Sequence, residues 1–364
     1  AGITTEKSKR GAAEGMSAAA RQTHDRAGAT AEGASGSARD LATVASAVEQ
    51  MSASTAEIGK QVGNVTEAVR AAAGALAEKL ARHDALETEL QRVGVSPHAP
   101  YTVSDPLFAL VARSGRPIAV HIAESDAEER FVREGEGPFA EAHRARGIPV
   151  APRAESPIAL LAKLGVLDAH PLLIHCVRVN GADIAAIAAS RSTVAHCPIS
   201  NAKLAHGIAP LGEMLDAGIA VGLGTDSMAS NNRMHLLEES RAAVLAQRAR
   251  TGHHDALSAV RALELATLGG ARALGLDARV GSLEVGKEAD LAAFDLSSLA
   301  GTADADPEAA LVFALGAEPA RFVAVAGIAR VWNWELLSED LELDGRVRES
   351  SAALKNWVSA HQGR

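Results

Sequence analysis

The chain has 364 residues, a net charge of −9 and two cysteines. An acidic balance argues against nucleic-acid binding, which needs a basic surface, and two cysteines provide no disulfide framework. The sequence has no apolar run long enough to span a membrane and no basic-then-apolar leader. We therefore expect a cytoplasmic protein with one large domain or two to three small ones.

The first part of the chain differs in composition from the rest. Phe, Trp, Tyr, Pro and Cys are all absent before residue 90, and glycines weaken any helix in residues 1–40, which we expect to be frayed or disordered. From residue 41 to 70, apolar residues and one threonine are spaced alternately three and four apart, which predicts a coiled coil; an amphipathic helix on a globular core is the alternative. The spaced residues are Leu41, Val44, Val48, Met51, Thr55, Ile58, Val62, Val65 and Val69.

The stretch from Val44 to Val62, which is rich in Ala and Ser, resembles the cytoplasmic helical region of methyl-accepting chemotaxis proteins. The resemblance covers residues 1–73 and implies a helical segment that associates with other helices. A homo-oligomer formed through this N-terminal helix is the partner that the resemblance and the spacing suggest.

From residue 94 onward, short apolar runs alternate with helical stretches. Helix signals are clear between the runs: Ser156 and Pro157 are suited to a helix start, and Gly165 to its end. Strands that alternate with helices predict an α/β protein with a parallel sheet. The expected strands are residues 93–97, 117–122, 171–176, 192–197 and 219–224.

The pattern changes again after Leu276. Residues 280–295 predict a turn followed by a strand, and residues 322–326 and 329–332 predict two more strands. Residues 346–360 have the composition of a closing helix.

His121 and Glu124 follow one of the apolar runs, just past the expected strand end. On a turn from strand to loop, both side chains can face one cavity. A neutral imidazole can bind a divalent metal, and a glutamate can move a proton from water to a leaving group. The alternative is a hydrogen-bonded core histidine beside a glutamate on a solvated loop.

Other strand ends also carry polar candidates. Asp226 can bind metal or accept a proton, with a helix N-cap as the alternative. Of His175 and His196, one can be a metal or substrate ligand while the other bonds to a buried carbonyl. His98 is a further pocket candidate. We expect Cys176 and Cys197 to be buried as small hydrophobic residues, and His206, His253 and His254 to lie in solvent-exposed loops.

Six motifs occur in the order found in the amidohydrolase superfamily. Over about residues 90–345 the chain resembles most its cytosine-deaminase and chlorohydrolase branch. That branch includes methylthioadenosine/S-adenosylhomocysteine deaminases and aminodeoxyfutalosine deaminases. The motifs are Pro97-His-Ala-Pro-Tyr-Thr-Val-Ser104, His121-Ile-Ala-Glu-Ser125, His175-Cys-Val177, His196-Cys-Pro-Ile-Ser-Asn201, Gly222-Leu-Gly-Thr-Asp-Ser-Met-Ala-Ser-Asn-Asn232 and Gly281-Ser-Leu-Glu-Val-Gly-Lys-Glu-Ala-Asp290.

The resemblance implies a (β/α)8 barrel with a small β-sandwich, one Zn or Fe ion, and hydrolytic deamination of an aminated purine-like ring. By position, His121 and Asp226 are similar to metal ligands, and Glu124 is similar to the proton shuttle. His175 is similar to the group that holds water and substrate, and His98 to a substrate contact. Asp226 and Glu124 are expected to move protons while ammonia leaves, with Glu124 and His175 also binding substrate.

One feature of the family is missing. No His-x-His pair, which the family carries on its first strand, occurs in this sequence. We therefore expect two of four metal ligands, weak metal binding and little or no deaminase activity from the chain alone. His98 and His175 can substitute as ligands, or a partner subunit can donate histidines.

The resulting expectation is a partial (β/α)8 barrel fused to a helical segment. The alternatives are a non-catalytic helical interaction or signalling protein that carries a barrel remnant, and an artefactual fusion of two genes. The expected parts are a helical segment at 1–89, barrel strands four to eight at 90–276, part of the β-sandwich at 277–345 and a C-terminal helix at 346–364.

Overall fold

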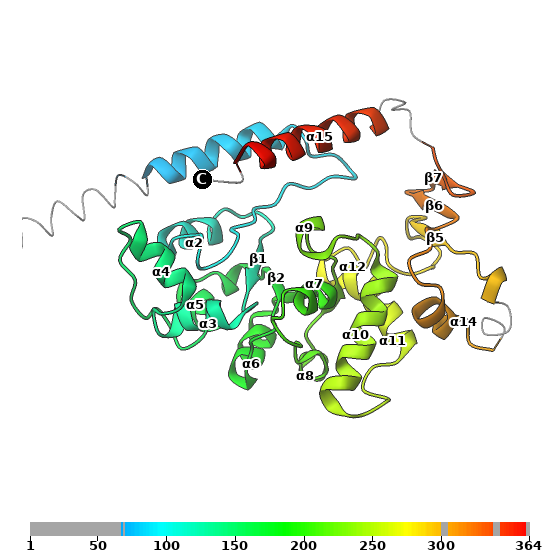
Figure 1. Ribbon diagram of the computed structural model, residues 1–364, viewed down its shortest axis with the longest axis horizontal. Helices are drawn as coiled ribbons and strands as arrows, with labels where there is room; N and C mark the ends of the chain where they lie inside the picture. The colour runs from blue at the N-terminus through cyan, green and yellow to red at the C-terminus, as the bar shows by residue number, and fades with distance from the viewer. Residues whose placement is uncertain (1–66, 68–69, 300–304, 338–342, 362–364) are drawn as a thin grey trace, which may run out of the picture. The chain divides into compact units, whose positions relative to one another are not determined.

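The chain divides into two compact units, residues 1–78 and 79–364. Residues 70–84 are helical. The expected disorder of residues 1–40 and almost all of the predicted coiled coil lie outside the described part of the chain, so both remain predictions. The computed structural model describes residues 67, 70–299, 305–337 and 343–361 (Figure 1).

Four short strands form a parallel sheet in the second unit, with neighbours in chain order. Helices connect one strand to the next, which confirms the predicted α/β class with a parallel sheet. Among the described residues the sheet is open and does not close into a barrel. The strands are β1 (Ala119–Ile122), β2 (Leu172–His175), β3 (Thr193–His196) and β4 (Val221–Leu223).

One face of this sheet is packed and the other is partly open. Along β1, β2 and β3, fully buried residues alternate with half-buried ones, and side chains of a strand point alternately to the two faces. Val120, Leu173 and Val194 lie side by side in the register and have no exposed surface. They form the centre of the core on the packed face.

The predicted strand at 93–97 is wrong in extent, because this segment makes a single parallel bridge between Val95 and Ile118. Pro97 has no backbone N–H, so it cannot continue the hydrogen-bond ladder of a strand. The segment still runs beside β1, since the N–H of His121 donates to the carbonyl of His98 at 2.9 Å.

The predicted helix signals around residues 156–165 are confirmed. The Ser156 hydroxyl accepts the N–H of Ala159 at 3.0 Å, Pro157 opens α5, and Gly165 follows the helix with a φ of +73°. The helices of this region are α2 (Asp105–Ala112), α3 (Asp126–Arg133), α4 (Pro138–Ala145), α5 (Pro157–Lys163), η1 (Leu167–Ala169), α6 (Gly181–Ser190), α7 (Pro198–Lys203) and α8 (Leu211–Asp216).

Strand β4 is covered by helices from the following part of the chain. Its Gly222 packs so closely on Gly270 that a Cβ at position 222 would lie 2.6 Å from the Cα of Gly270. The covering helices α10, η2 and α12 all contact β4. The helices after β4 are α9 (Met228–Asn231), α10 (Leu236–Thr251), α11 (Ala259–Glu264), the π-helical turn η2 (Leu265–Gly269) and α12 (Gly270–Ala273).

A second, antiparallel sheet follows, and it contains the three strands predicted after Leu276. The predicted closing helix is also present. No helix among the described residues combines the length and apolar character needed to cross a bilayer. The elements are β5 (Leu291–Ala293), η3 (Ser297–Leu299), α14 (Pro307–Ala309), η4 (Ala310–Ala314), β6 (Phe322–Val325), β7 (Ile328–Trp332), β8 (Glu335–Leu336) and α15 (Leu343–His361).

Candidate metal centre

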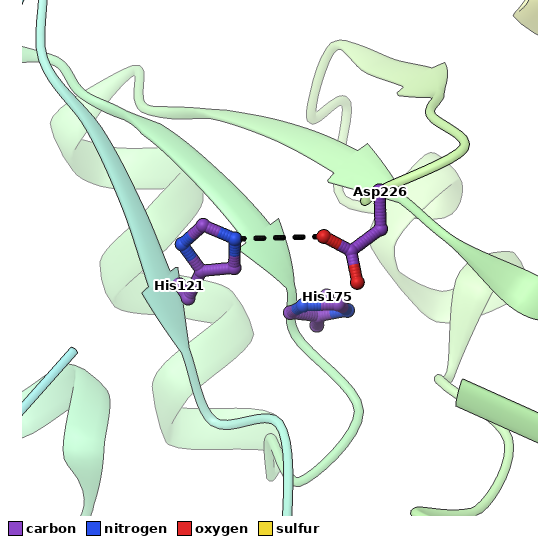
Figure 2. Close-up of side chains that lie close together, drawn as sticks. All are labelled: His121, His175 and Asp226. Carbon is purple, nitrogen blue, oxygen red and sulfur yellow. Dashed lines mark ion pairs between the residues drawn. The ribbon is translucent and has the colours of Figure 1, made fainter. Parts of the chain in front are cut away.

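Three polar side chains meet at the carboxyl edge of the parallel sheet. His121 lies on β1, His175 ends β2, and Asp226 follows β4. Each contributes one ligand atom, and these atoms all lie within 4.8 Å of one another. Figure 2 shows the two imidazoles and the carboxylate directed at one region, with His121 Nε2 3.7 Å from Asp226 Oδ1. The three side chains lie together because the carboxyl ends of neighbouring parallel strands share one edge of the sheet.

Left-handed backbone at the strand ends orients these side chains. His175 has a φ of +78°, Asp226 of +56°, and Ala123, between His121 and Glu124, of +51°. Residues other than glycine adopt this conformation at a cost, and such residues cluster at functional sites. The chain therefore turns sharply at the end of each strand, which keeps the polar side chains at the sheet edge.

The imidazole of His175 is held in one orientation. Its Nδ1 donates to Oδ1 of Asn201 at 2.8 Å, so Nε2 carries the free lone pair. That Nε2 atom is buried and has no hydrogen-bond partner among the described residues. Burial lowers the pKa of His175 to about 4, which keeps the ring neutral at physiological pH.

Asp226 is held as a carboxylate. The hydroxyls of Ser200 and Ser230 both donate to its Oδ2, the first at 2.7 Å, and Oδ1 remains free to face His121. Burial opposes the charged form, but the hydrogen bonds from Ser230 and Ser200 outweigh it and lower the pKa of Asp226. Burial, and then the neighbouring His98, lower the pKa of His121, so its ring is a neutral nitrogen donor.

Glu124 lies beside this cluster. Its Oε1 is 3.5 Å from Nε2 of His175 and 3.3 Å from Nε2 of His206. Burial, and then the charge of Asp226, raise the pKa of Glu124 to about 7. A carboxyl group with such a pKa can both accept and release a proton near neutral pH.

The prediction that His206 is a solvent-exposed loop residue is wrong. Its side chain is 22% exposed and faces Glu124. The His206 N–H donates to the carbonyl of Asn201 at 2.9 Å, which folds the end of α7 back toward the site. This contact joins separate segments, so local sequence carried no signal for it. His253 and His254 are exposed, as predicted.

The remaining candidates are His98, which lies close to His121, and the buried residues His196, Cys176 and Cys197. The His98 ring centre is 5.0 Å from that of His121, and its Nδ1 is bonded to the Thr102 hydroxyl. His196 is buried, yet neither ring nitrogen has a partner among the described residues, so the suggested bond to a buried carbonyl is absent. Cys176 and Cys197 are buried, as predicted.

Two buried glutamates near the site, Glu128 and Glu239, were not predicted from the sequence. Glu128 has no exposed surface, and its two carboxylate oxygens accept the N–H groups of Ala123 at 3.1 Å and Glu124 at 2.8 Å. Ser125 and Glu128 have the spacing of a capping box, which was the available signal. Glu239 is also fully buried, and no local pattern marks it.

Comparison with known proteins identifies the family of this chain. The amidohydrolase family model matches residues 3–329. The chain belongs to the amidohydrolase family. It is similar to the crystal structure of an adenosine deaminase from Xanthomonas campestris with bound zinc, at a TM-score of 0.66 and 32% identity, covering 77% of this chain and 62% of that one.

Two curated relatives of this amidohydrolase are named as nucleoside deaminases. A 5-methylthioadenosine/S-adenosylhomocysteine deaminase of Moorella thermoacetica is 37% identical over 252 residues, covering 68% of this chain and 55% of the relative. A 5'-deoxyadenosine deaminase of Methanosarcina acetivorans is 35% identical over 250 residues, covering 68% of this chain and 54% of the relative. The chain thus spans about half the length of the curated relatives it matches.

The residues of the amidohydrolase site fit a divalent metal ion. Catalytic zinc commonly has three protein ligands, and tetrahedral bonds of about 2.0–2.2 Å leave ligand atoms roughly 3.4 Å apart. The 3.7 Å between His121 Nε2 and Asp226 Oδ1 is close to that spacing. The unpartnered Nε2 of His175 supplies a third donor at the same edge.

Proposed function

We propose that this chain binds one zinc ion through His121, His175 and Asp226, and that its reaction is the hydrolytic deamination of an aminated purine-like nucleoside. The observation that carries the proposal is the convergence of two imidazole nitrogens and a carboxylate oxygen within 4.8 Å, with Glu124 beside them. A bound divalent ion makes water acidic enough to supply hydroxide near neutral pH. The names of the relatives support the choice of substrate class.

The roles of the protein groups follow from their surroundings. Glu124, with a pKa of about 7, takes a proton from the attacking water and delivers it to the departing amine. Asp226 remains ionised and would hold the metal, with Oδ1 as the oxygen that the two serines leave free. His98, whose ring centre lies 5.0 Å from that of His121, would contact the substrate.

His175 has a changed role in this proposal. The family resemblance assigns it to water and substrate, whereas here it serves as a third ligand, because the sequence has no His-x-His pair. Each missing ligand removes a bond and part of the geometric constraint. We therefore propose weaker zinc binding and much slower deamination by this chain than by a family member that has all four ligands.

Zinc titration of metal-depleted protein tests the proposal. We expect one zinc per chain, lost in His121→Ala and Asp226→Ala and retained in His254→Ala, which removes an exposed histidine. Ammonia release is measured at saturating zinc with 5'-methylthioadenosine, S-adenosylhomocysteine and 5'-deoxyadenosine. Zinc binding that survives both ligand substitutions would exclude this site, and fast turnover would contradict the proposed impairment.

A further inference from the structure

Glu239 on α10 joins two segments that end at the metal centre. Its carboxylate has no exposed surface. Oε2 accepts the N–H of Ile199 at 3.1 Å, at the start of α7, and Oε1 accepts the side-chain amide of Asn231, at the end of α9. One buried carboxylate therefore ties the chain after β3 to the loop after β4.

Both tied segments carry a serine that binds Asp226. Ser200 directly follows Ile199, Ser230 directly precedes Asn231, and both hydroxyls donate to Oδ2 of Asp226. The connection to Glu239 thus holds the two donors that keep Oδ2 occupied.

The same amide also fixes the backbone before Asp226. Nδ2 of Asn231 donates to the carbonyl of Thr225 at 2.7 Å as well as to Glu239. Asp226 itself has a φ of +56°, a conformation that persists only where its surroundings enforce it. With the backbone and Oδ2 held, Oδ1 is left facing His121 at 3.7 Å.

We propose that Glu239 is a positioning residue that fixes the orientation of the Asp226 carboxylate for metal binding, acting through Ser200, Ser230 and Asn231. This inference rests on the proposed metal site and extends it to a residue that does not touch the metal. If Glu239 merely anchored α10, its loss would change stability and leave the metal affinity unaltered.

The decisive variant is Glu239→Gln, which keeps the shape but places an N–H donor against the donor of Ile199 or Asn231. The matched control is Glu238→Gln, one residue earlier on the same helix, where the carboxylate pairs with Arg233. Co²⁺ is the probe, because its visible absorption reports ligand geometry. We expect at least a tenfold rise in the Co²⁺ dissociation constant and an altered spectrum for Glu239→Gln, and less than a twofold change for Glu238→Gln.

A mutant cycle separates positioning from general destabilisation. The double variant Ser200→Ala/Ser230→Ala should weaken Co²⁺ binding, and adding Glu239→Gln should weaken it little further, because all three act on one carboxylate. Effects that multiply would overturn the proposal. If Glu239→Gln does not fold, Glu239→Asp, which keeps the charge and shortens the reach, replaces it in the cycle.

Failure of the proposed function is distinguishable from failure of this inference. A wild-type chain that binds neither Co²⁺ nor Zn²⁺ rejects the metal site. The inference is then judged by amide hydrogen exchange of the metal-free protein, where Glu239→Gln should speed exchange in residues 197–203 and 224–232 relative to Glu238→Gln. Equal exchange would overturn it, as would wild-type affinity and spectrum in a chain that does bind metal.

Discussion

Nδ1 of His175 donates to Oδ1 of Asn201 across 2.8 Å, and this bond decides which nitrogen of the ring faces the metal centre. A histidine whose outer nitrogen is fixed presents its other nitrogen in a single tautomer and orientation. Asn201 begins the turn that also returns His206 to the site. Asn201 therefore contacts two histidines of the site: its side chain orients the His175 ring, and its backbone carbonyl accepts the N–H of His206.

Replacing Asn201 should weaken metal binding without removing a ligand. In Asn201→Leu the volume is kept but Nδ1 of His175 loses its acceptor, so the ring can take the wrong tautomer. Loss of such an outer partner typically costs about 10- to 100-fold in metal affinity, and we expect a fall in that range by calorimetric zinc titration. Unchanged affinity would show that the hydrogen bond does not orient His175.

Substitution of Glu124 should separate chemistry from metal binding. Glu124→Gln keeps the shape of the side chain but cannot accept a proton, and general acid–base catalysis typically contributes about 10²- to 10⁴-fold. We expect any ammonia release at saturating zinc to fall by at least roughly 10²-fold, with zinc stoichiometry retained. Asp226→Asn is the contrasting variant, which should lose both ammonia release and zinc binding. Equal activity of Glu124→Gln and wild type would remove Glu124 from the mechanism.

Glu128 should make stability depend on pH in a direction unusual for a glutamate. Burial raises its pKa from the ordinary 4.5 to about 8, despite the N–H donors of Glu124 and Ala123. The folded state thus holds the proton more tightly than the unfolded state, so the stability that Glu128 contributes is full below about pH 4.5 and is lost as the pH rises toward 8.

Urea unfolding at pH 5 and pH 8 measures this effect. The stability of wild type relative to Glu128→Gln should fall between these pH values by on the order of 3–4 kcal/mol. The neighbouring Glu129→Gln, which alters surface pairs with Arg133 and Arg178, should show no such fall. A pH-independent difference for Glu128→Gln would mean that this carboxyl stays ionised in the fold.

Alanine should have opposite effects on stability at Gly222, which packs against Gly270, and at Gly212, which has open space around it. A Cβ at position 222 would lie 2.6 Å from the Cα of Gly270, so β4 and α12 must separate, at a cost of about 1–3 kcal/mol. Gly212 in α8 has open space around it, and alanine there should stabilise by about 0.5–1 kcal/mol. Denaturant midpoints measure both, and a neutral Gly222→Ala would contradict the close packing.

The predicted coiled coil yields a test of association. Ile58→Lys places a charge in the proposed seam of the N-terminal segment, whereas Ala53→Lys lies outside it. Sedimentation velocity should show a homo-oligomer for the unaltered chain and for Ala53→Lys, and a monomer for Ile58→Lys. A chain that sediments as a monomer throughout would reject the proposed homo-oligomer.

The sequence predicted the candidate metal ligands better than the buried residues that surround and orient them. His121, His175 and Asp226 follow apolar runs directly, and parallel strands bring their carboxyl ends to one edge. His206 and Glu239 depend on contacts between separate segments, which no local periodicity encodes. Glu128 has a local signal in its capping-box spacing from Ser125, but that spacing does not predict that its carboxyl group accepts the N–H groups of Ala123 and Glu124. The strand predicted at 93–97 is too long for a local reason, because Pro97 within it and Pro100 after it have no backbone N–H with which to continue a hydrogen-bond ladder.

Those prolines have a consequence for solubility. In the part of the chain that the structure describes, the segment beside Ile118 forms one border of the parallel sheet and is bridged there only through Val95. Unpaired sheet borders recruit strands from other molecules and seed fibrils, and proline discourages this because it offers no N–H to an incoming strand. Pro97 and Pro100 offer no N–H at this border, so they should disfavour the addition of a strand from another molecule.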